Sequence, residues 1–108
     1  GQSQRCWNVN FSRKNCKLPP FKKTMFYYTY VLESLKDKSL YIGYTTDLKK
    51  RFKEHNDGKN QATKSFRPYK LIYYEAFLSR IDAKHREVYL KSGWGFRSIK
   101  KMLKNYLC

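Results

Sequence analysis

The segment that decides the fold is FYYTYVLESLKDKSLYIGYT, residues 26–45. Residues 26–32 are almost all aromatic or β-branched, a composition typical of a β-strand. Residues 36–39, Lys-Asp-Lys-Ser, supply a polar turn, and residues 40–45 have the pattern of a second strand. Because the connection is so short, we expect the two strands to pair as an antiparallel hairpin. In the second strand, Gly43 indicates that another group approaches the backbone closely.

The hairpin is followed by the signals of a helix. Thr46 or Asp47 is expected to cap its first turn, and Gly58 is expected to stop it. Leu48 and Phe52 are four residues apart in the sequence, so they are predicted to lie on the buried side of this helix.

A third strand, a second helix and a last helix are predicted in the remaining sequence. Residues 69–77 read as the strand, and the pair Ser79 and Asp82 resembles a capping box that opens a helix to about residue 91. Gly93-Trp94-Gly95 is predicted to interrupt the chain, with the last helix starting at about Ser98. Its packed face is predicted to contain Ile99, Met102, Leu103 and Tyr106. The order ββαβαα indicates an α+β fold, a small three-stranded antiparallel sheet flanked by helices.

The charge of the chain restricts its partners. Lysine and arginine total 24 against 8 acidic residues, which gives a formal net charge of +16 for 108 residues. Such a charge favours polyanions and disfavours cationic or neutral apolar partners. Residues 1–24 contain no acid, so we read them as a basic extension, and residues 25–108 as the folded domain. The domain can bury a core because 41% of the residues are hydrophobic.

The apolar segments bear on location. All are far shorter than the roughly 20 residues of a membrane span, and the first residues lack the apolar run of a secretory signal. The three cysteines, Cys6, Cys16 and Cys108, are odd in number and without a CxxC spacing, which favours free thiols over a disulfide framework or a zinc site. We therefore expect a cytoplasmic protein that does not bind membranes.

The tyrosines of the hairpin are the first candidates for chemistry. Successive side chains of a strand alternate between its two faces, so Tyr28 and Tyr30 share one face, as do Tyr41 and Gly43. The pairing register decides whether these two faces coincide. Each tyrosine, considered alone, is also explained as a packing residue of the sheet.

A cation and a titratable group lie on the first helix. Arg51 and His55 are four residues apart and therefore neighbours on one helix face. A guanidinium can stabilise charge on a phosphate, and an imidazole can move or orient a proton. The alternative is a solvated basic face, because the surrounding residues include Lys49, Lys50 and Lys53.

An isolated acid on the second helix is the candidate metal ligand. Glu87 lies among cations, and Mg²⁺ takes one or two carboxylates and completes its shell with water and phosphate oxygens. No second carboxylate has the spacing of a two-metal site. The alternative is a simple ion pair between Glu87 and Lys91.

The candidates occur in a specific order along the chain. In sequence, they are Tyr28-Thr29-Tyr30, Tyr41-Ile42-Gly43, Arg51, His55 and Arg86-Glu87. With ten residues between Tyr30 and Tyr41, this pattern resembles the GIY-YIG nuclease domain. The closer resemblance is to the small single-domain bacterial members, which are related to the nuclease domain of the bacterial excinuclease. It spans residue 26 to about residue 107.

The resemblance implies a Mg²⁺- or Mn²⁺-dependent endonuclease that hydrolyses DNA by a one-metal mechanism. Tyr41 would match the general base of the family, and Tyr30 its companion tyrosine. A phenol titrates near pH 10, so a base of this type needs positive charge nearby. Arg51 would stabilise the attacked phosphate, and His55 would hydrogen-bond the base or aid proton transfer. Glu87 would match the single metal-binding glutamate.

The resemblance also implies contacts with the nucleic acid and shows departures from the family pattern. Gly43 would be the strand glycine beside the bound nucleic acid. The other contacts expected around the site come from Tyr44, Lys49, Lys50, Lys53 and Lys91. The first motif lacks its Gly and Ile, Tyr44 replaces a lysine of the excinuclease domain, and the late asparagine of the family has only Asn105 as a candidate.

Two other functions stay open at this point. A catalytically weak or inactive nucleic-acid-binding module needs only charge and exposed aromatic rings, and a basic structural protein of a ribonucleoprotein particle needs only charge. Neither needs an isolated acid in a basic surface. No element that reads base sequence is visible, so duplex or branched DNA is the expected substrate, and an accessory protein or DNA-binding subunit is an open question. RNA as a substrate, a role in repair or in mobile elements, and the oligomeric state are undecided.

Overall fold

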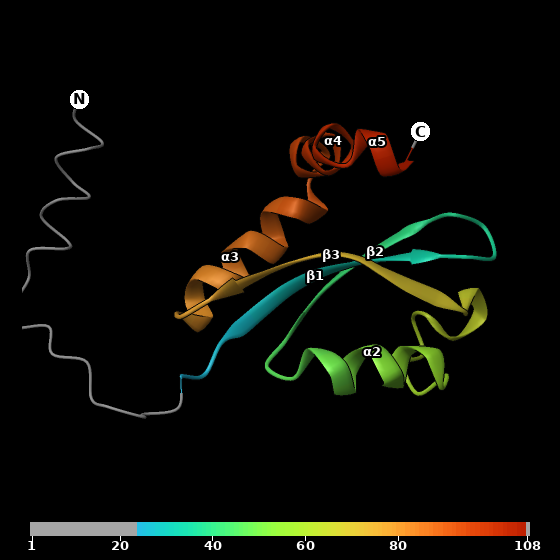
Figure 1. The fold of residues 1–108 in the computed structure, drawn as a ribbon, viewed down its shortest axis with the longest axis horizontal. Coiled ribbons are helices and arrows are strands. Elements are labelled where there is room, and N and C mark those ends of the chain that lie inside the picture. Colours follow the sequence, from blue (N-terminus) through green and yellow to red (C-terminus); the bar gives the residue numbers. More distant parts are fainter. Residues whose placement is uncertain (1–23, 108) are drawn as a thin grey trace, which may run out of the picture.

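The sheet of the protein is three-stranded and antiparallel. A computed structural model describes residues 24–107, with strands β1 (Tyr27–Ser34), β2 (Leu40–Thr45) and β3 (Tyr69–Phe77) in the spatial order β2-β1-β3 (Figure 1). This confirms the predicted fold class, with β1 ending two residues later than residue 32. Residues 1–23 of the predicted extension and all three cysteines lie outside the described residues.

The register of the β1–β2 hairpin brings the candidate residues to one face. Tyr30 pairs with Gly43, and Tyr28 pairs with Thr45. Paired residues of neighbouring strands point to the same side of a sheet, so Tyr28, Tyr30, Tyr41 and Gly43 share one face. The register thus answers the question that the alternation pattern left open.

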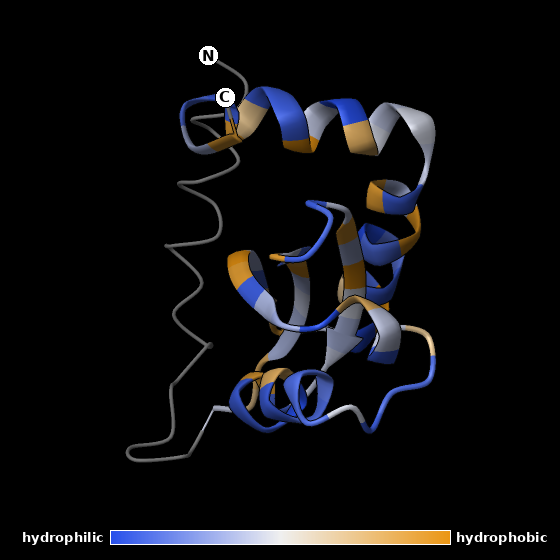
Figure 2. Ribbon diagram, turned by 90° about the vertical axis from the view of Figure 1, so that its right-hand side faces the viewer, coloured by the Kyte–Doolittle hydropathy of each residue, from blue (hydrophilic) through white to orange (hydrophobic). Residues whose placement is uncertain are grey.

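Helices cover both faces of the sheet. They are α2 (Leu48–Asn56), α3 (Arg80–Lys91), α4 (Gly93–Met102) and α5 (Lys104–Leu107), with a short 3₁₀ helix, η1 (Lys64–Phe66), before β3. In Figure 1, α2 lies on one side of the sheet, and α3, α4 and α5 lie on the other. In the view of Figure 2, the hydrophobic bands of α4 lie on the side that faces the sheet.

Each face of the sheet has its own core. On the α2 side, the buried residues Tyr30, Leu32 and Tyr69 pack together. On the other side, the core consists of Val31, Ile42, Leu90 and Ile99. The central strand β1 contributes alternately to both cores, as the period of two along a strand requires. The candidate tyrosines therefore belong to the α2 side.

The helix starts of α2 and α3 follow the predicted caps. The Asp47 side chain accepts a hydrogen bond from the Lys50 backbone N–H at 3.1 Å, which satisfies one free donor of the first turn. Ser79 accepts from the Asp82 N–H at 3.4 Å. The predicted stripe of α2 packs against the tyrosine core but stays half-buried, and His55 is the fully buried residue of this helix.

The predicted start of the last helix is wrong. Helix α4 begins at Gly93 rather than near Ser98, because the Ser92 side chain accepts a hydrogen bond from the Gly95 N–H at 3.2 Å and caps the helix earlier. The predicted packed face is also wrong in part. Ile99 is buried and Leu103 packs against it, but Met102 is 46% exposed and Tyr106 45%.

Gly95 allows α4 to leave α3 at a sharp angle. A Cβ atom at this position would lie 2.0 Å from the Tyr89 carbonyl oxygen, which is backbone and cannot rotate away. The interruption predicted at Gly93-Trp94-Gly95 is wrong, because these residues form the first turn of α4 and the break between α3 and α4 is at Ser92. None of the helices in residues 24–107 is long and apolar enough to span a bilayer.

We predict that Gly95→Ala destabilises the fold by about 1–3 kcal/mol, because the added methyl group overpacks the α3–α4 junction. The matched control is Gly93→Ala in the same helix turn, where a Cβ has no neighbouring atom within 4 Å. This control is expected to be neutral or stabilising by up to about 1 kcal/mol. Urea unfolding of both variants measures the difference, and equal stabilities would contradict the close contact at Gly95.

Candidate active site

The ring of Tyr30 lies across the edge strand over Gly43. A Cβ atom at position 43 would lie 2.4 Å from the Tyr30 hydroxyl oxygen, so any side chain there would displace the ring. The close approach predicted at Gly43 is thus made by Tyr30 itself. Because β1 is central and β2 is the edge strand, this packing carries the Tyr30 hydroxyl from the middle of the sheet toward its edge.

A buried chain of hydrogen bonds extends from Tyr30. Its hydroxyl lies 2.9 Å from His55 Nε2, and His55 Nδ1 lies 2.8 Å from Thr63 Oγ1. His55 and Thr63 are fully buried, and Tyr30 is almost so. Thr63 donates to the Asn60 carbonyl at 3.4 Å, which leaves its lone pair for the His55 N–H. The neutral His55 with its proton on Nδ1 satisfies the whole chain, since Nε2 then accepts from Tyr30.

Burial holds both ends of this pair in their neutral forms. Burial raises the pKa of Tyr30 to about 12, although the neighbouring Arg51 guanidinium acts in the opposite direction. Burial also lowers the pKa of His55, and the positive charge of Arg51 adds to that effect. The interpretation of the His55 helix face as a solvated basic face is therefore wrong for His55 itself.

Tyr41 is the more accessible tyrosine of the two motifs. It is half-buried, and its ring centre lies 5.0 Å from that of His55 and 6.5 Å from that of Tyr30. One ring nitrogen of His55 is hydrogen-bonded to Tyr30 and the other to Thr63, so the contact between His55 and Tyr41 is van der Waals packing. A water molecule from solvent can reach the Tyr41 side of this cluster but not the buried Tyr30 hydroxyl.

Arg51 offers an unused hydrogen-bond donor beside the cluster. Its Nη1 donates to the Glu54 carboxylate at 3.4 Å, whereas its Nε is buried and has no partner among residues 24–107. Arg51 and His55 both line a small cavity of about 70 Å³. A buried donor without a partner is costly, and an anionic oxygen from a ligand would satisfy it.

Glu87 lies on the sheet-facing side of α3. It occupies the same stripe as the buried residues Ala83 and Leu90, and its side chain is only 16% exposed. Lys91 pairs with it at 3.0 Å and Lys84 at 3.9 Å. The ion pair with Lys91 that the sequence suggested is therefore present, but the glutamate is much less exposed than a solvated surface pair.

The carboxylate of Glu87 also acts on the tyrosine cluster. The pKa of Tyr30 is raised mainly by burial, and the charge of Glu87 is a smaller contribution in the same direction. Helix α3 packs against both β1 and β2. Glu87 therefore lies on the side of the sheet opposite α2 (Figure 1), and its negative charge still acts on the Tyr30 hydroxyl.

Two sets of contacts fix α3 on the sheet. Arg86 forms a double hydrogen bond with the Glu75 carboxylate on β3, at 2.8 and 3.0 Å. Thr29 on β1 donates its hydroxyl to the Ala83 carbonyl at 2.7 Å. Since Arg86 precedes Glu87, these bonds define the rotation of the helix and hence the position of the glutamate.

The remaining predicted contacts lie around this site. Lys49, Lys50 and Lys53 are exposed on α2, although Lys53 pairs with Asp57 at 2.9 Å. The Lys84 ammonium lies over the Tyr44 ring, 4.6 Å from its centre. Asn105, the candidate for the late asparagine, is exposed on α5.

The sequence reasoning missed two residues of this site. Thr63 orients His55 but lies eight residues later in a polar loop, where nothing distinguishes it from other polar residues. Lys84 pairs with Glu87 and covers Tyr44. Its spacing of three residues from Glu87 on one helix was a usable signal.

A metal ion fits this site only through Glu87. Within residues 24–107, no three His, Cys, Asp or Glu side chains are grouped to hold a metal. One carboxylate is nevertheless a sufficient protein anchor for Mg²⁺ when water and phosphate oxygens supply the other ligands. The donor set therefore fits a metal that arrives with, or is completed by, a phosphate.

Comparison with known proteins identifies close relatives. UPF0213 protein SpyM3_1077 of Streptococcus pyogenes serotype M3 is 51% identical over 65 residues, which cover 59% of this chain and 70% of the relative. UPF0213 protein SpyM50708 of serotype M5 shows the same identity and the same coverage. No solved structure gives a significant match.

The family model of the GIY-YIG catalytic domain matches residues 26–96, a range that contains the hairpin, the tyrosine and histidine cluster, and Glu87. The resemblance seen in the sequence is thereby confirmed. The chain belongs to the GIY-YIG catalytic domain family, whose members are nuclease-type domains.

Proposed function

We propose that this protein is a divalent-metal-dependent endonuclease that hydrolyses DNA phosphodiester bonds. The observation that supports this most is the unpartnered Nε of Arg51, buried beside the neutral Tyr30–His55 pair. A site with one unused guanidinium donor, one accessible phenol and one carboxylate at its edge suits an anionic phosphate rather than a neutral substrate.

The proposed reaction begins with attack of water on the phosphorus, in line with the leaving oxygen. Tyr41 takes the proton of the attacking water, because it is the accessible phenol of the cluster. Arg51 donates to a phosphate oxygen and stabilises the charge that develops there. The leaving oxygen departs with the bonding electron pair and is then protonated by solvent.

Tyr30 and His55 have a supporting role in this proposal. The Tyr30 hydroxyl is buried and donates to His55, so neither group can exchange a proton with the attacking water directly. Together they form a buried, neutral pair of side chains against which the Tyr41 ring packs. The resemblance implies that His55 hydrogen-bonds the base or aids proton transfer; in this proposal it instead holds the companion tyrosine, to which it is hydrogen-bonded.

Glu87 is the residue that would hold Mg²⁺ or Mn²⁺. Such an ion, when bound, neutralises charge on the phosphate and on the leaving oxygen. Lys84, one helix turn before Glu87, and Lys91, one turn after it, both pair with its carboxylate. Both lysine side chains are half exposed, so they can move away from the carboxylate without any rearrangement of the core.

Nucleic acid would approach along the exposed basic residues near the site. We propose that Lys49, Lys50, Lys53 and Lys91, with Tyr44, lie along duplex or branched DNA. Gly43, which the resemblance also placed beside the nucleic acid, is buried beneath the Tyr30 ring and acts here by making room for it. A catalytically inactive binding module remains the alternative function, favoured by the net charge of +16. That alternative does not explain why Glu87 is partly buried or why Tyr30, His55 and Thr63 form a buried chain of hydrogen bonds. A cytoplasmic location and an accessory protein also remain predictions.

The metal-ligand role of Glu87 is tested by Glu87→Gln, which keeps the shape and the helix propensity but weakens any metal anchor. We predict that cleavage of supercoiled and branched DNA collapses across a full Mg²⁺ titration, while metal-free DNA binding persists. Asp82→Asn is the matched control, because it removes one exposed carboxylate from the same helix. Similar Mg²⁺ curves for the two variants would show that Glu87 is a structural ion-pair partner. Absence of cleavage by the wild type on every DNA form would favour the binding module.

The base is tested by Tyr41→Phe, which removes one hydroxyl from the accessible tyrosine. We predict a fall in the single-turnover rate of roughly 100-fold or more, the usual scale for a general base, with an unchanged melting temperature. Tyr74→Phe is the control, since Tyr74 lies on β3, the strand at the other edge of the sheet, and is 52% exposed. A near-normal rate for Tyr41→Phe would mean that another group accepts the proton.

The neutral state of His55 gives a stability prediction. The pKa of His55 is lowered in the folded protein, so the unfolded chain binds a proton first as the pH falls below about 6.5. The stabilisation is therefore complete above that pH and is lost at lower pH, at up to about 1.4 kcal/mol per pH unit. Urea unfolding between pH 7.5 and 5 should show this loss in the wild type and in His85→Gln, a variant of the exposed histidine, but not in His55→Gln.

A direct NMR titration of the His55 ring protons checks the same point without a variant. The midpoint of their titration is expected to lie below 6.5, the ordinary value for histidine, because burial lowers the pKa of His55. A midpoint at or above 6.5 would contradict the buried neutral imidazole.

A further inference from the structure

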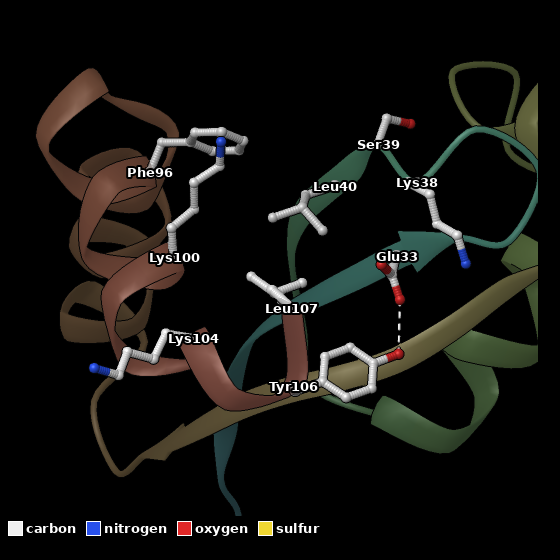
Figure 3. Close-up of a pocket in the computed structure, with 9 residues that line it drawn as sticks. All are labelled: Glu33, Lys38, Ser39, Leu40, Phe96, Lys100, Lys104, Tyr106 and Leu107. Atoms are coloured by element: carbon white, nitrogen blue, oxygen red, sulfur yellow. Dashed lines mark hydrogen bonds between the residues drawn. The ribbon is translucent and has the colours of Figure 1, made fainter.

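A large hollow of the described surface lies away from the candidate active site. It is a groove of about 850 Å³ between the β1–β2 hairpin and the helices α4 and α5 (Figure 3). Leu40 and Phe96, which line it, pack against the core on the α4 side of the sheet. The Tyr30–His55 cluster belongs to the core on the α2 side. The sheet therefore separates the groove from the tyrosine cluster.

The floor of this groove is apolar and its rim is cationic. Leu40, Phe96 and Leu107 provide the apolar part of the lining, and Lys38, Lys100 and Lys104 are its cationic residues. None of these three lysines forms a salt bridge with another residue of the range 24–107. The Lys100 ammonium lies over the Phe96 ring, 5.1 Å from its centre, and forms no salt bridge with another described residue, so it can meet an anion.

The single acid of the groove is already engaged. Glu33 is only 7% exposed and accepts a hydrogen bond from the Tyr106 hydroxyl at 2.7 Å, drawn as the dashed line in Figure 3. The Lys70 ammonium lies 5.3 Å from the centre of the Tyr106 ring. Residues 88–107 contain no acid at all but carry five cations. The field in the groove is therefore positive.

An apolar floor with a rim of ammonium groups suits a ligand that has flat apolar groups and negative charges at short intervals. Single-stranded nucleic acid has this chemistry, because its unpaired bases can contact the floor while its phosphates meet the lysines. A duplex presents phosphates but keeps its bases stacked inside. We propose that this groove binds a single-stranded segment of nucleic acid, as a second binding surface on the opposite face of the sheet from the tyrosine cluster.

This inference extends the proposed nuclease function by naming an unpaired arm of the substrate, but binding in the groove does not require cleavage. The test therefore measures binding without divalent metal. The probe is a fluorescein-labelled 12-residue oligothymidylate, followed by fluorescence anisotropy as a function of salt. Failure of the nuclease proposal would show as absence of cleavage, and failure of the groove proposal would show in the anisotropy alone.

The decisive comparison uses two double variants of α4 and α5 with equal charge change. Lys100→Glu with Lys104→Glu reverses two groove lysines, and Arg97→Glu with Lys101→Glu reverses two cations that do not line the groove. We expect the groove variant to bind oligothymidylate about tenfold more weakly than the control variant. Its slope of log affinity against log salt is expected to be less steep by about 1.4, for two lost phosphate contacts of a single strand. Both variants are expected to keep the wild-type melting temperature.

A site-specific measurement accompanies the comparison. In the wild type, oligothymidylate is expected to shift the NMR signals of the Leu40 and Leu107 methyl groups, and the groove variant should abolish these shifts. Equal affinities of the two double variants, or unshifted Leu40 and Leu107 methyl groups at saturation, would overturn the proposal. A groove variant that loses binding to phosphatidylglycerol vesicles but keeps oligothymidylate binding would overturn it in favour of an anionic lipid surface.

Discussion

The packing of the Tyr30 ring over Gly43 is the constraint on which the rest of the site depends. A strand register shifted by one residue would place Tyr30 opposite a side chain and turn the motif tyrosines to the other face. With the observed register, the hydroxyl reaches His55, and Thr63 completes the buried chain. Three fully paired polar groups in a small core are then stable, whereas any one of them alone would be an unsatisfied buried group.

The second half of the site depends on how α3 is held. The Arg86–Glu75 double bond and the Thr29–Ala83 bond set the helix rotation. That rotation directs Glu87 inward between Ala83 and Leu90, where an apolar residue would pack without a desolvation cost. Its lysine partners are half exposed, and such pairs contribute little to stability. Stability alone therefore gives no reason for a glutamate at this position, and this supports the ligand-binding role that we propose for it.

The sequence was sufficient for the features that local chemistry determines. The hairpin, β3 and the caps at Asp47 and Ser79 follow from composition and spacing, and the order of the motif residues identified the family. It was not sufficient where distant groups decide. The start of α4 depends on a capping serine and a contact with α3, and the burial of His55 depends on a loop that brings Thr63 over it. Helical spacing predicted that His55 lies beside Arg51, but it could not predict the hydrogen bond between His55 and Tyr30.

The two proposed surfaces restrict the shape of the nucleic acid that can use both. The tyrosine cluster lies on the α2 side of the sheet and the groove on the α4 side, so a ligand that occupies both must pass around the sheet. A duplex cannot do so within one small domain, because its persistence length is about 50 nm. A single strand can, since it bends at every nucleotide. The architecture therefore fits a branched or partly unpaired substrate, with the duplex portion at the active site and the unpaired arm in the groove.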